Sequence, residues 1–337
     1  MRIGVNPQKD KKVTVVDYFH QVIIPVYIPN REEYFKDSFQ ILRICLESLF
    51  KTIHLKTYIT IVNNGSCKEV KDYLELLFEN KQIQELINTT NIGYINAMLK
   101  GVSGQNFPII TTADCDVLFL KGWQEASYAV FEAFPKAGVV SPTPISNMVR
   151  RLTNNVLVEN LFSRKMKFTK VVDSQSMIDF AKSINNEKLS KLVHLEKYLT
   201  IRNNECVAMI GASHFVVTYR ADIFSTLEKS TPFVLGGNSD DIFDVPAIKK
   251  GFWRLSTADN YAYHMGNVFE EWMKEKLDSL EVDTNLNRLI SPIKEVKINR
   301  IKNWINLNFL SKILFKKPFW KLFLRYKGLT KIEAKNY

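Results

Sequence analysis

The chain has 337 residues, 46% of them hydrophobic, which is enough for one large α/β domain or two modest ones. Its net charge of +11 is unevenly spread, because residues 297–332 contain ten Lys or Arg and no Asp or Glu. The rest of the chain has 36 basic and 35 acidic residues and is close to neutral. This near-neutral body argues against a protein that binds nucleic acid.

The cysteines and the apolar runs exclude further classes. Four widely spaced cysteines form no Cys-x-x-Cys pair, which argues against a zinc site or a disulfide framework and suits a reducing compartment. The amino-terminal residues lack the apolar core of a signal peptide, and no run approaches the ~18 apolar residues of a membrane span. We therefore expect a cytoplasmic protein, free or peripheral to a membrane.

Strand and helix patterns alternate along the first third of the chain. A polar lead-in at 1–20 precedes six elements, expected as strand, helix, strand, helix, strand and helix near 21–30, 31–54, 57–66, 70–77, 86–90 and 94–101. Pro25 inside the first strand indicates a strand end or an edge. Ala97 and Gly101, four residues apart, predict close packing of the last helix. The alternation predicts a mostly parallel sheet with right-handed crossovers.

The next strand carries the residues on which the functional hypothesis depends. Residues 108–120 read PIITTADCDVLFL, so an apolar strand delivers Asp114 and Asp116 at its carboxyl end. Alternate residues of an extended segment share one side, so we expect the two carboxylates to project together while Cys115 turns away. Such a pair suits Mg²⁺ or Mn²⁺ bound together with a pyrophosphate. The alternative is a chance Asp-x-Asp, or acids that cap the next helix.

Two further polar turns end strands of the same predicted sheet. Asn63-Asn64-Gly65-Ser66 ends the second strand, and Asn91-Ile92-Gly93 follows the third. Ligands of open α/β sheets bind beyond the carboxyl ends of the strands. The two turns and the two aspartates therefore predict a single site, more specifically than any one of them does alone.

On these motifs, residues 21–123 resemble the nucleotide-binding half of a family 2 glycosyltransferase with the GT-A fold. The matching stretches are the Val-x-x-Pro start of the first strand, TIVNNGS, TNIGYINAMLKG and TTADCD. The resemblance implies a Rossmann-like, mostly parallel central sheet flanked by helices, and a nucleotide-sugar donor. The sequence departs from the family where Asn63 and Asn64 replace the usual acidic pair, and where Met98 and Leu99 replace a frequent Arg-Asn.

The resemblance also implies roles for individual residues. The first strand end and the asparagine pair would hold the base and the ribose (Pro25, Val26, Tyr27, Asn63, Asn64). Asn91 and Gly93 would belong to the same donor site. Asp114 and Asp116 would hold the metal and the ribose or pyrophosphate.

The second half is expected to hold the acceptor side. A strand at 138–142 and helices at 174–184 and 186–199 are expected, the helices within an irregular stretch that is either a surface insertion or the acceptor-binding region. Its basic residues would meet an anionic acceptor or form a solvated face, and we favour the second (Arg150, Arg151, Arg164, Lys165, Lys167). Residues 207–219 predict a central strand pair that turns at Gly211.

A double glycine and two acids, Gly236-Gly237-Asn-Ser-Asp240-Asp241, precede a helix that is expected to stop at Gly251. Glycines let a backbone approach a substrate closely, so Gly236 and Gly237 join the donor site. In the family, a Glu-Asp pair at a helix start is followed by a glycine about a dozen residues later. Asp240-Asp241 with Gly251 resembles this pattern, with a spacing one residue shorter. The resemblance implies that Asp241, or else Asp240, is the general base of an inverting transfer. A carboxylate near the acceptor hydroxyl can take its proton as the new bond forms. The alternative is that one of the pair caps the helix.

Residues 256–266 predict a strand that ends in His264. Similar enzymes often place a histidine here as a third metal ligand, which is the role that the resemblance implies for His264. A lone histidine is otherwise more often a packed or surface residue. The other histidines are interpreted as structural (His20, His54, His194, His214).

The carboxyl-terminal segment combines three properties. Residues 271–290 predict a polar helix, and 297–329 interleave aromatic and aliphatic with basic residues, with a break into two short helices at Pro318. Such a segment is typical of a membrane interface, so 297–332 would bind an anionic membrane surface. The alternatives are helices that pack on the catalytic body or that form a homodimer.

Four segments follow from these patterns: a lead-in at 1–20, a nucleotide-sugar-binding half at 21–141, an acceptor-binding half at 142–270 and a basic helical extension at 271–337. The resemblance implies a glycosyltransferase, dependent on Mn²⁺ or Mg²⁺, that moves a sugar to a hydroxyl of a glycan or lipid-linked acceptor in polysaccharide or glycoconjugate synthesis. Its expected place is the inner face of the cell membrane, as a peripheral protein.

Two other functions are weighed against this one. A sugar-phosphate nucleotidyltransferase would usually show a glycine-rich basic loop near the first strand, but 21–35 hold no glycine and one basic residue, Arg31. A catalytically silent sugar-binding scaffold on the same fold is the third hypothesis. Metal-dependent nucleotide binding separates an enzyme from a scaffold.

Overall fold

The computed structural model of the chain describes residues 4–11, 18–104, 106–226, 230–236, 241–282 and 293–337. One large sheet contains β1 (His20–Val26), β2 (Thr57–Asn64), β3 (Glu85–Thr89), β4 (Ile109–Ala113), β6 (Ala137–Ser141), β7 (Met166–Lys170), β8 (Lys197–Asn203), β9 (Cys206–Ile210), β10 (Val216–Arg220) and β11 (Trp253–Thr257). A small second sheet pairs β5 (Val117–Phe119) with β12 (Ala262–His264).

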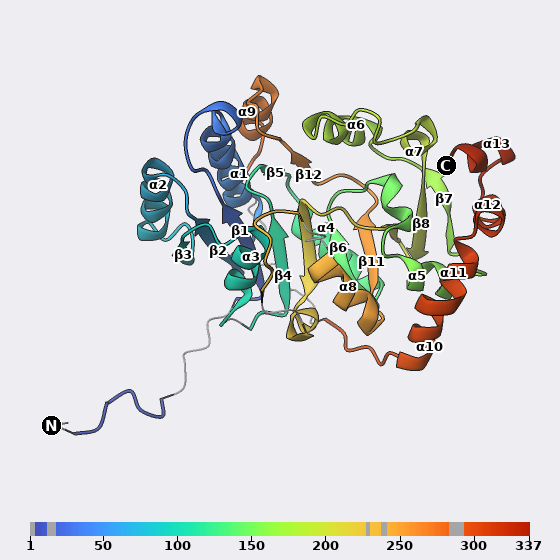
Figure 1. Cartoon of the computed structure of the whole chain (residues 1–337), viewed down its shortest axis with the longest axis horizontal. Coiled ribbons are helices and arrows are strands. Elements are labelled where there is room, and N and C mark those ends of the chain that lie inside the picture. Colours follow the sequence, from blue (N-terminus) through green and yellow to red (C-terminus); the bar gives the residue numbers. More distant parts are fainter. Residues whose placement is uncertain (1–3, 12–17, 105, 227–229, 237–240, 283–292) are drawn as a thin grey trace.

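Helices flank the large sheet. They are α1 (Ser38–Thr52), α2 (Lys68–Glu79), α3 (Tyr94–Val102), α4 (Trp123–Ala133), α5 (Asn154–Glu159), α6 (Ser174–Ser183), α7 (Leu192–Glu196), α8 (Asp241–Lys250), α9 (Glu271–Asp278), α10 (Arg300–Ile305), α11 (Ser311–Leu314), α12 (Lys317–Tyr326) and α13 (Lys331–Asn336). Figure 1 shows α2 and β3 at one end of the sheet and the carboxyl-terminal helices stacked along the other.

The first four strands of the sheet are parallel, as the alternation of strands and helices predicts. β1 pairs with β2 along its whole length, but with β4 only over His20–Ile23. Pro25 therefore lies beyond the ladder with β4, at the strand end that its position predicts. Gly101 of α3 packs directly on β1, because a Cβ there would lie 2.6 Å from Cγ2 of Ile23. The close packing expected for this helix is confirmed.

Beyond β4 the sheet is mixed. Its order is β3-β2-β1-β4-β10-β6-β11-β9-β8-β7, and β10 runs antiparallel to both β4 and β6. β9 and β10 form at the predicted place but are not a pair, since β6 and β11 lie between them. The prediction was wrong on this point because a run of apolar residues shows that strands are buried without showing which strands they join.

The helix expected at 186–199 is also corrected. Only Leu192–Glu196 is helical, and from Lys197 the chain is strand β8, which pairs with β7 and β9. Tyr198 and Ile201 are buried in this strand, so burial on the sheet outweighs the local helical pattern. The helices expected at 174–184 and 241–250 are confirmed as α6 and α8. Of the helix expected at 271–290, α9 forms the first part and 283–290 lie outside the described residues.

The small sheet brings the two halves of the chain together at the end of β4. β5 follows β4 after the short turn 114–116, and β12 pairs with β5 so that His264 lies opposite Val117. The N–H of Met265 donates to the carbonyl oxygen of Asp116 at 2.8 Å. The residue after β12 is thus fixed directly beside the predicted acids.

The carboxyl-terminal helices α12 and α13 pack on the body. Trp320, Phe323 and Leu324 are buried in the same core cluster as residues of β8, β9 and β11. The N–H of Phe168 in β7 donates to the carbonyl oxygen of Lys327 at 2.9 Å. Of the three arrangements considered for the carboxyl-terminal segment, these two helices show packing on the catalytic body. None of the helices within the described ranges has the length and apolar character needed to cross a membrane.

Candidate active site

Three side chains that can bind a metal meet at the carboxyl end of β4. Carboxylate oxygens of Asp114 and Asp116 and a ring nitrogen of His264 all lie within 4.8 Å of one another. The predicted convergence is found, but its cause differs from the expected one. Residues 114–116 lie in the turn between β4 and β5, so the turn aims the acids, not the alternation of a strand.

The environment of His264 selects the tautomer that a metal ligand needs. Its Nδ1 lies 2.8 Å from Oγ of Ser183, whose hydroxyl donates to the carbonyl oxygen of Phe180 at 2.8 Å. Because that bond uses the hydroxyl proton, Nδ1 carries the ring proton and donates it to Ser183. The lone pair of Nε2 then faces Oδ2 of Asp116 at 3.4 Å. Burial lowers the pKa of His264 below its ordinary value, which keeps the ring neutral.

Asp116 shows that these residues fit a cation. Its Oδ1 is buried and has no hydrogen-bond donor among the described residues, and burial raises the pKa of the carboxyl group to about 7. A lone pair and a carboxylate in contact repel each other unless a proton or a cation lies between them. A divalent cation would relieve this repulsion, and the two carboxylates of the group are ligands that suit Mn²⁺ or Mg²⁺.

Two tyrosines flank the acids. Tyr94, the first residue of α3, donates its hydroxyl to Oδ1 of Asp114. Tyr34 faces the same group, since burial and then the negative charges of Asp116, Cys115 and Asp114 raise the pKa of its hydroxyl. The Tyr34 side chain is largely exposed, so it lies at the open side of the site.

Asn63 and Asn64 are buried and tie the loops of the expected donor site together. Nδ2 of Asn63 donates to Oδ1 of Asn88 at 2.8 Å, and Oδ1 of Asn63 accepts from the N–H of Ser66 at 3.0 Å. Oδ1 of Asn64 accepts from the N–H of Ile92 at 2.9 Å. These amides shape the ends of β2 and β3. Their contact with a nucleotide base stays a prediction.

The turn before α3 requires glycine. Gly93 has a φ of 91°, and a Cβ there would lie 2.7 Å from the carbonyl oxygen of Phe233. Oδ1 of Asn91 accepts from the N–H of Gly93 at 3.1 Å, which fixes the turn. The carbonyl oxygen of Val234 accepts from the N–H of Tyr94 at 2.8 Å. The segment that leads to the double glycine therefore lies over the start of α3.

The remaining expected donor residues differ in exposure. Pro25 and Val26 are buried, whereas Tyr27 is exposed and packs edge-on against Phe35 with ring centroids 5.9 Å apart. Of these three, Tyr27 is the one whose side chain can meet a ligand. Gly236 is described and has a φ of 78°, with open space where a Cβ would be. Gly237 and Asp240 lie outside the described residues.

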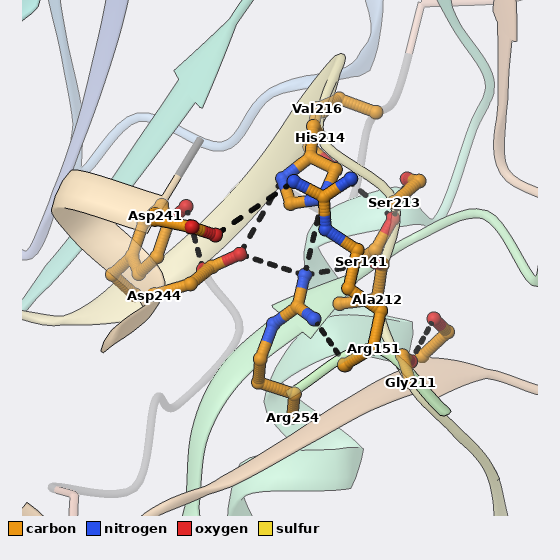
Figure 2. A network of polar contacts seen from close by, with 12 residues as sticks. Ser141, Arg151, Gly211, Ala212, Ser213, His214, Val216, Asp241, Asp244 and Arg254 are labelled. Carbon is orange, nitrogen blue, oxygen red and sulfur yellow. Dashed lines mark hydrogen bonds and ion pairs between the residues drawn. The ribbon is translucent and has the colours of Figure 1, made fainter. Parts of the chain in front are cut away.

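The two described acids of α8 have different surroundings (Figure 2). Asp241, the first helical residue, is 42% exposed and lies 3.8 Å from Nη2 of Arg151. Asp244, one turn later, is fully buried, 2.7 Å from Nη2 of the equally buried Arg254 and 3.4 Å from Nδ1 of His214. Burial and then the charges of Arg254 and Arg151 lower the pKa of His214 to about 3. Asp244 therefore holds a neutral histidine and a buried arginine, and Asp241 is open to a substrate.

A cleft of about 490 Å³ lies between α6 and α9, next to the group of Asp114, Asp116 and His264, since Ser183 lines it and contacts His264. Tyr263 and Trp272 line it with their rings edge to face, 5.8 Å between centroids, and carboxylates and lysines from both helices complete it. Because Ser183 both lines this cleft and holds His264, the cleft and the candidate metal site share a wall.

Sequence reasoning missed three residues that shape the site: Ser183, Tyr94 and Tyr34. Tyr94 directly follows Gly93, so its place at a helix start could have been found from the turn motif. Ser183 and Tyr34 reach the acids from segments distant in sequence, and no local pattern marks them.

A sheet whose parallel strands end in polar turns and clustered acids has the architecture of a nucleotide-binding enzyme. The sequence profile of Glycosyl transferase family 2 matches residues 22–193, just over half of the chain. The chain belongs to this family, and it is a glycosyltransferase that uses a nucleotide-sugar donor. Its mixed α/β architecture is consistent with the GT-A fold that the sequence motifs imply.

Several solved structures resemble the chain. TarS residues 1–349 from S. aureus are 12% identical, with a TM-score of 0.43 and coverage of 92% of this chain and 81% of that chain. The same protein in complex with UDP-GlcNAc is 13% identical, with a TM-score of 0.43 and coverage of 90% and 75%. The mannosyltransferase PcManGT from Pyrobaculum calidifontis, in complex with GDP-Man and Mn²⁺, is 12% identical, with a TM-score of 0.40 and coverage of 74% and 59%. No curated protein matches the sequence.

Proposed function

We propose that the chain transfers a sugar from a nucleotide-sugar to a hydroxyl group of a glycan or lipid-linked acceptor, with inversion, and that it needs Mn²⁺ or Mg²⁺. The observation that carries the proposal is the group of Asp114, Asp116 and His264, whose ligand atoms lie within 4.8 Å of one another. In this group Oδ1 of Asp116 has no hydrogen-bond donor among the described residues, and Nε2 of His264 lies 3.4 Å from Oδ2 of Asp116. When bound, the cation would neutralise the diphosphate that leaves with the nucleoside, so no protein acid is needed there.

Asp241 is the proposed general base. A base must reach the acceptor hydroxyl, and Asp241 is exposed at the start of α8. Asp244 is unsuited to the role because it is fully buried against Arg254. Asp240 remains the second choice. The base would take the hydroxyl proton as the acceptor oxygen attacks the anomeric carbon.

The cleft between α6 and α9 is the proposed site for a further sugar unit of the acceptor. Aromatic rings such as those of Tyr263 and Trp272 can cover the apolar face of a sugar, while the surrounding charged groups can bind its hydroxyls. The cleft shares a wall with His264, so an acceptor that fills it would extend away from the reacting centre.

Asp241→Asn tests the assignment of the base. We expect the variant to bind the donor nucleotide with unchanged affinity in Mn²⁺, and to lose transfer by at least about a hundredfold, since a positioned base contributes roughly 10²–10⁴-fold. Titration calorimetry with nucleoside diphosphates and an assay of sugar transfer give the two readings. Normal turnover by Asp241→Asn would move the base to Asp240 or refute the role.

The two other hypotheses make different predictions. A sugar-phosphate nucleotidyltransferase would release pyrophosphate from a nucleoside triphosphate, whereas a glycosyltransferase releases a nucleoside diphosphate from a nucleotide-sugar. A silent scaffold would release neither. A screen of nucleotide-sugars for metal-dependent release of nucleoside diphosphate names the donor of a glycosyltransferase. An assay of pyrophosphate release from nucleoside triphosphates then separates a nucleotidyltransferase from a scaffold.

We also propose that the enzyme works as a peripheral protein on the inner face of the cell membrane. The basic segment 297–332 supports this location because it carries ten positive and no negative side chains. A lipid-linked acceptor would be reached directly from that surface.

A further inference from the structure

The helical stretch 300–314 exposes most of its large apolar side chains and buries several small polar ones. It comprises α10, a π-helical turn at Asn306–Leu310 and α11. Six large apolar side chains are exposed on it: Ile301, Trp304, Ile305, Phe309, Leu310 and Ile313. We call this set the outer face. Trp304 and Phe309 are 64% and 61% exposed, so the largest rings are also among the least covered.

The side of the same stretch that faces the body carries small polar residues besides Leu314, which is buried in the core. Asn303, Asn306 and Ser311 are buried there. Nδ2 of Asn303 donates to the carbonyl oxygens of Ile248 and Lys249, at the end of α8, at 3.0 and 3.1 Å. These bonds anchor the helix without burying its aromatic residues. A helix on a water-soluble body normally shows the opposite arrangement, so the outer face is built to meet an apolar surface.

The charge around the outer face indicates which surface that is. Lys302, Lys312, Lys316 and Lys317 are exposed on or next to the stretch, and no acidic residue occurs between 297 and 332. A second copy of the chain would bring the same positive charge to the contact and repel it. An anionic lipid surface attracts the lysines and accepts the apolar side chains below its headgroups.

We infer that the outer face docks the enzyme on an anionic membrane surface, with α10 and α11 lying in the plane of the interface. The neighbouring helix α12 extends the same surface, since Phe319, Leu322 and Tyr326 are exposed on it while Trp320 and Phe323 are buried. Figure 1 shows α10, α11 and α12 along one edge of the molecule, far from α2. The body itself need not enter the membrane.

The test is co-sedimentation of the full chain with vesicles of mixed phosphatidylglycerol and phosphatidylcholine, and with vesicles of phosphatidylcholine alone. We expect binding to the anionic vesicles that weakens as salt is raised. The double variant Trp304→Ser with Phe309→Ser should lower the vesicle affinity by at least about tenfold, because two rings lose their burial in the interface. The fluorescence emission of Trp304 should shift to shorter wavelength when the protein binds vesicles. Subtracting the spectrum of a Trp304→Phe variant isolates the contribution of Trp304.

A matched control replaces exposed apolar residues at the other end of the molecule, Leu76→Ser with Phe78→Ser on α2, and should bind like the wild type. Two results would overturn the inference. One is absence of binding to anionic vesicles, or binding that the Trp304 and Phe309 changes leave unaltered. The other is a wild type that self-associates through this face, shown by light scattering as a dimer that the double variant abolishes, without vesicle binding.

Discussion

Ser183 determines which nitrogen of His264 faces the acids. Its hydroxyl donates to Phe180, so it can only accept from Nδ1 of the imidazole. The partner of a metal-binding histidine fixes its tautomer and its ring orientation. Ser183 is therefore a positioning residue, although it does not itself reach the proposed cation.

Ser183→Ala tests this role. The variant loses the acceptor for Nδ1–H, so both tautomers become available and the ring loosens. We expect the affinity for Mn²⁺, measured as the metal concentration needed for nucleoside diphosphate binding, to fall by about tenfold to a hundredfold. Thermal stability should change little, and Ser183→Thr should retain much of the affinity. Unchanged metal dependence in Ser183→Ala would mean that His264 is not a ligand.

Single residues also mark the limit of prediction from the sequence. Asp114 and Asp116 could be singled out in advance because they follow the apolar run that forms β4, and His264 because it ends a strand. Ser183 could not, because it ends a helix in an irregular region and meets His264 only after β12 has paired with β5. Residue type and spacing show which groups can bind a metal, but the partners that orient them come from tertiary packing.

Among the elements, α8 combines an exposed acid and a buried one within one turn. Asp244 neutralises Arg254, which also donates to the backbone oxygens of Arg151 and Ala212 at 2.7 and 3.0 Å. The buried arginine thus ties the start of α8 to β11 and to the loop after β9. Removal of its carboxylate partner would leave an uncompensated charge in the core.

We expect Asp244→Asn to destabilise the protein by about 3–5 kcal/mol, the range for breaking a buried ion pair. Asp241→Asn, three residues earlier on the same helix, should cost less than about 1 kcal/mol because Asp241 is exposed. Urea denaturation of the two variants measures both values. Equal stability of the two would show that Asp244 does not support the fold.

Element types were predictable where one pattern dominated, and less so where two competed. The alternation over 21–113 predicted β1 to β4 and the helices between them, because β1, β2 and β4 are buried apolar runs and each helix has one apolar face. The helix expected at 186–199 was wrong because a polar stretch with helical spacing leads into the strand residues Tyr198-Leu-Thr-Ile201, which the sheet buries. Pairing of β10 with β4 and β6 depends on the whole sheet, and no local pattern reports it.

In the whole molecule, the carboxyl-terminal segment contributes both to the hydrophobic core and to the surface. Its aromatic residues were all expected at a membrane interface, but they divide into a buried and an exposed set. Trp320 is 6% exposed, stacks on Phe323 at 5.2 Å and lies beneath the guanidinium of Arg150. The segment is therefore part of the core as well as part of the surface.

The two tryptophans of this segment give a matched comparison. Trp320→Ala should lower the free energy of unfolding by about 3–5 kcal/mol, the cost of removing a buried aromatic side chain. Trp304→Ala should stay within about 0.5 kcal/mol of the wild type, because its ring is exposed. Chemical denaturation followed by circular dichroism measures both. A small effect of Trp320→Ala would mean that α12 is not docked on the body in solution.

The central claim is that Asp114, Asp116 and His264 hold the divalent cation that binds the donor diphosphate. Calorimetric titration of UDP and of GDP, with Mn²⁺ and again with EDTA, tests it most directly. We expect the wild type to bind a nucleoside diphosphate only when the metal is present, and the folded variant Asp116→Asn not to bind it. Equal affinity with and without metal, or an unaltered titration for Asp116→Asn, would contradict it.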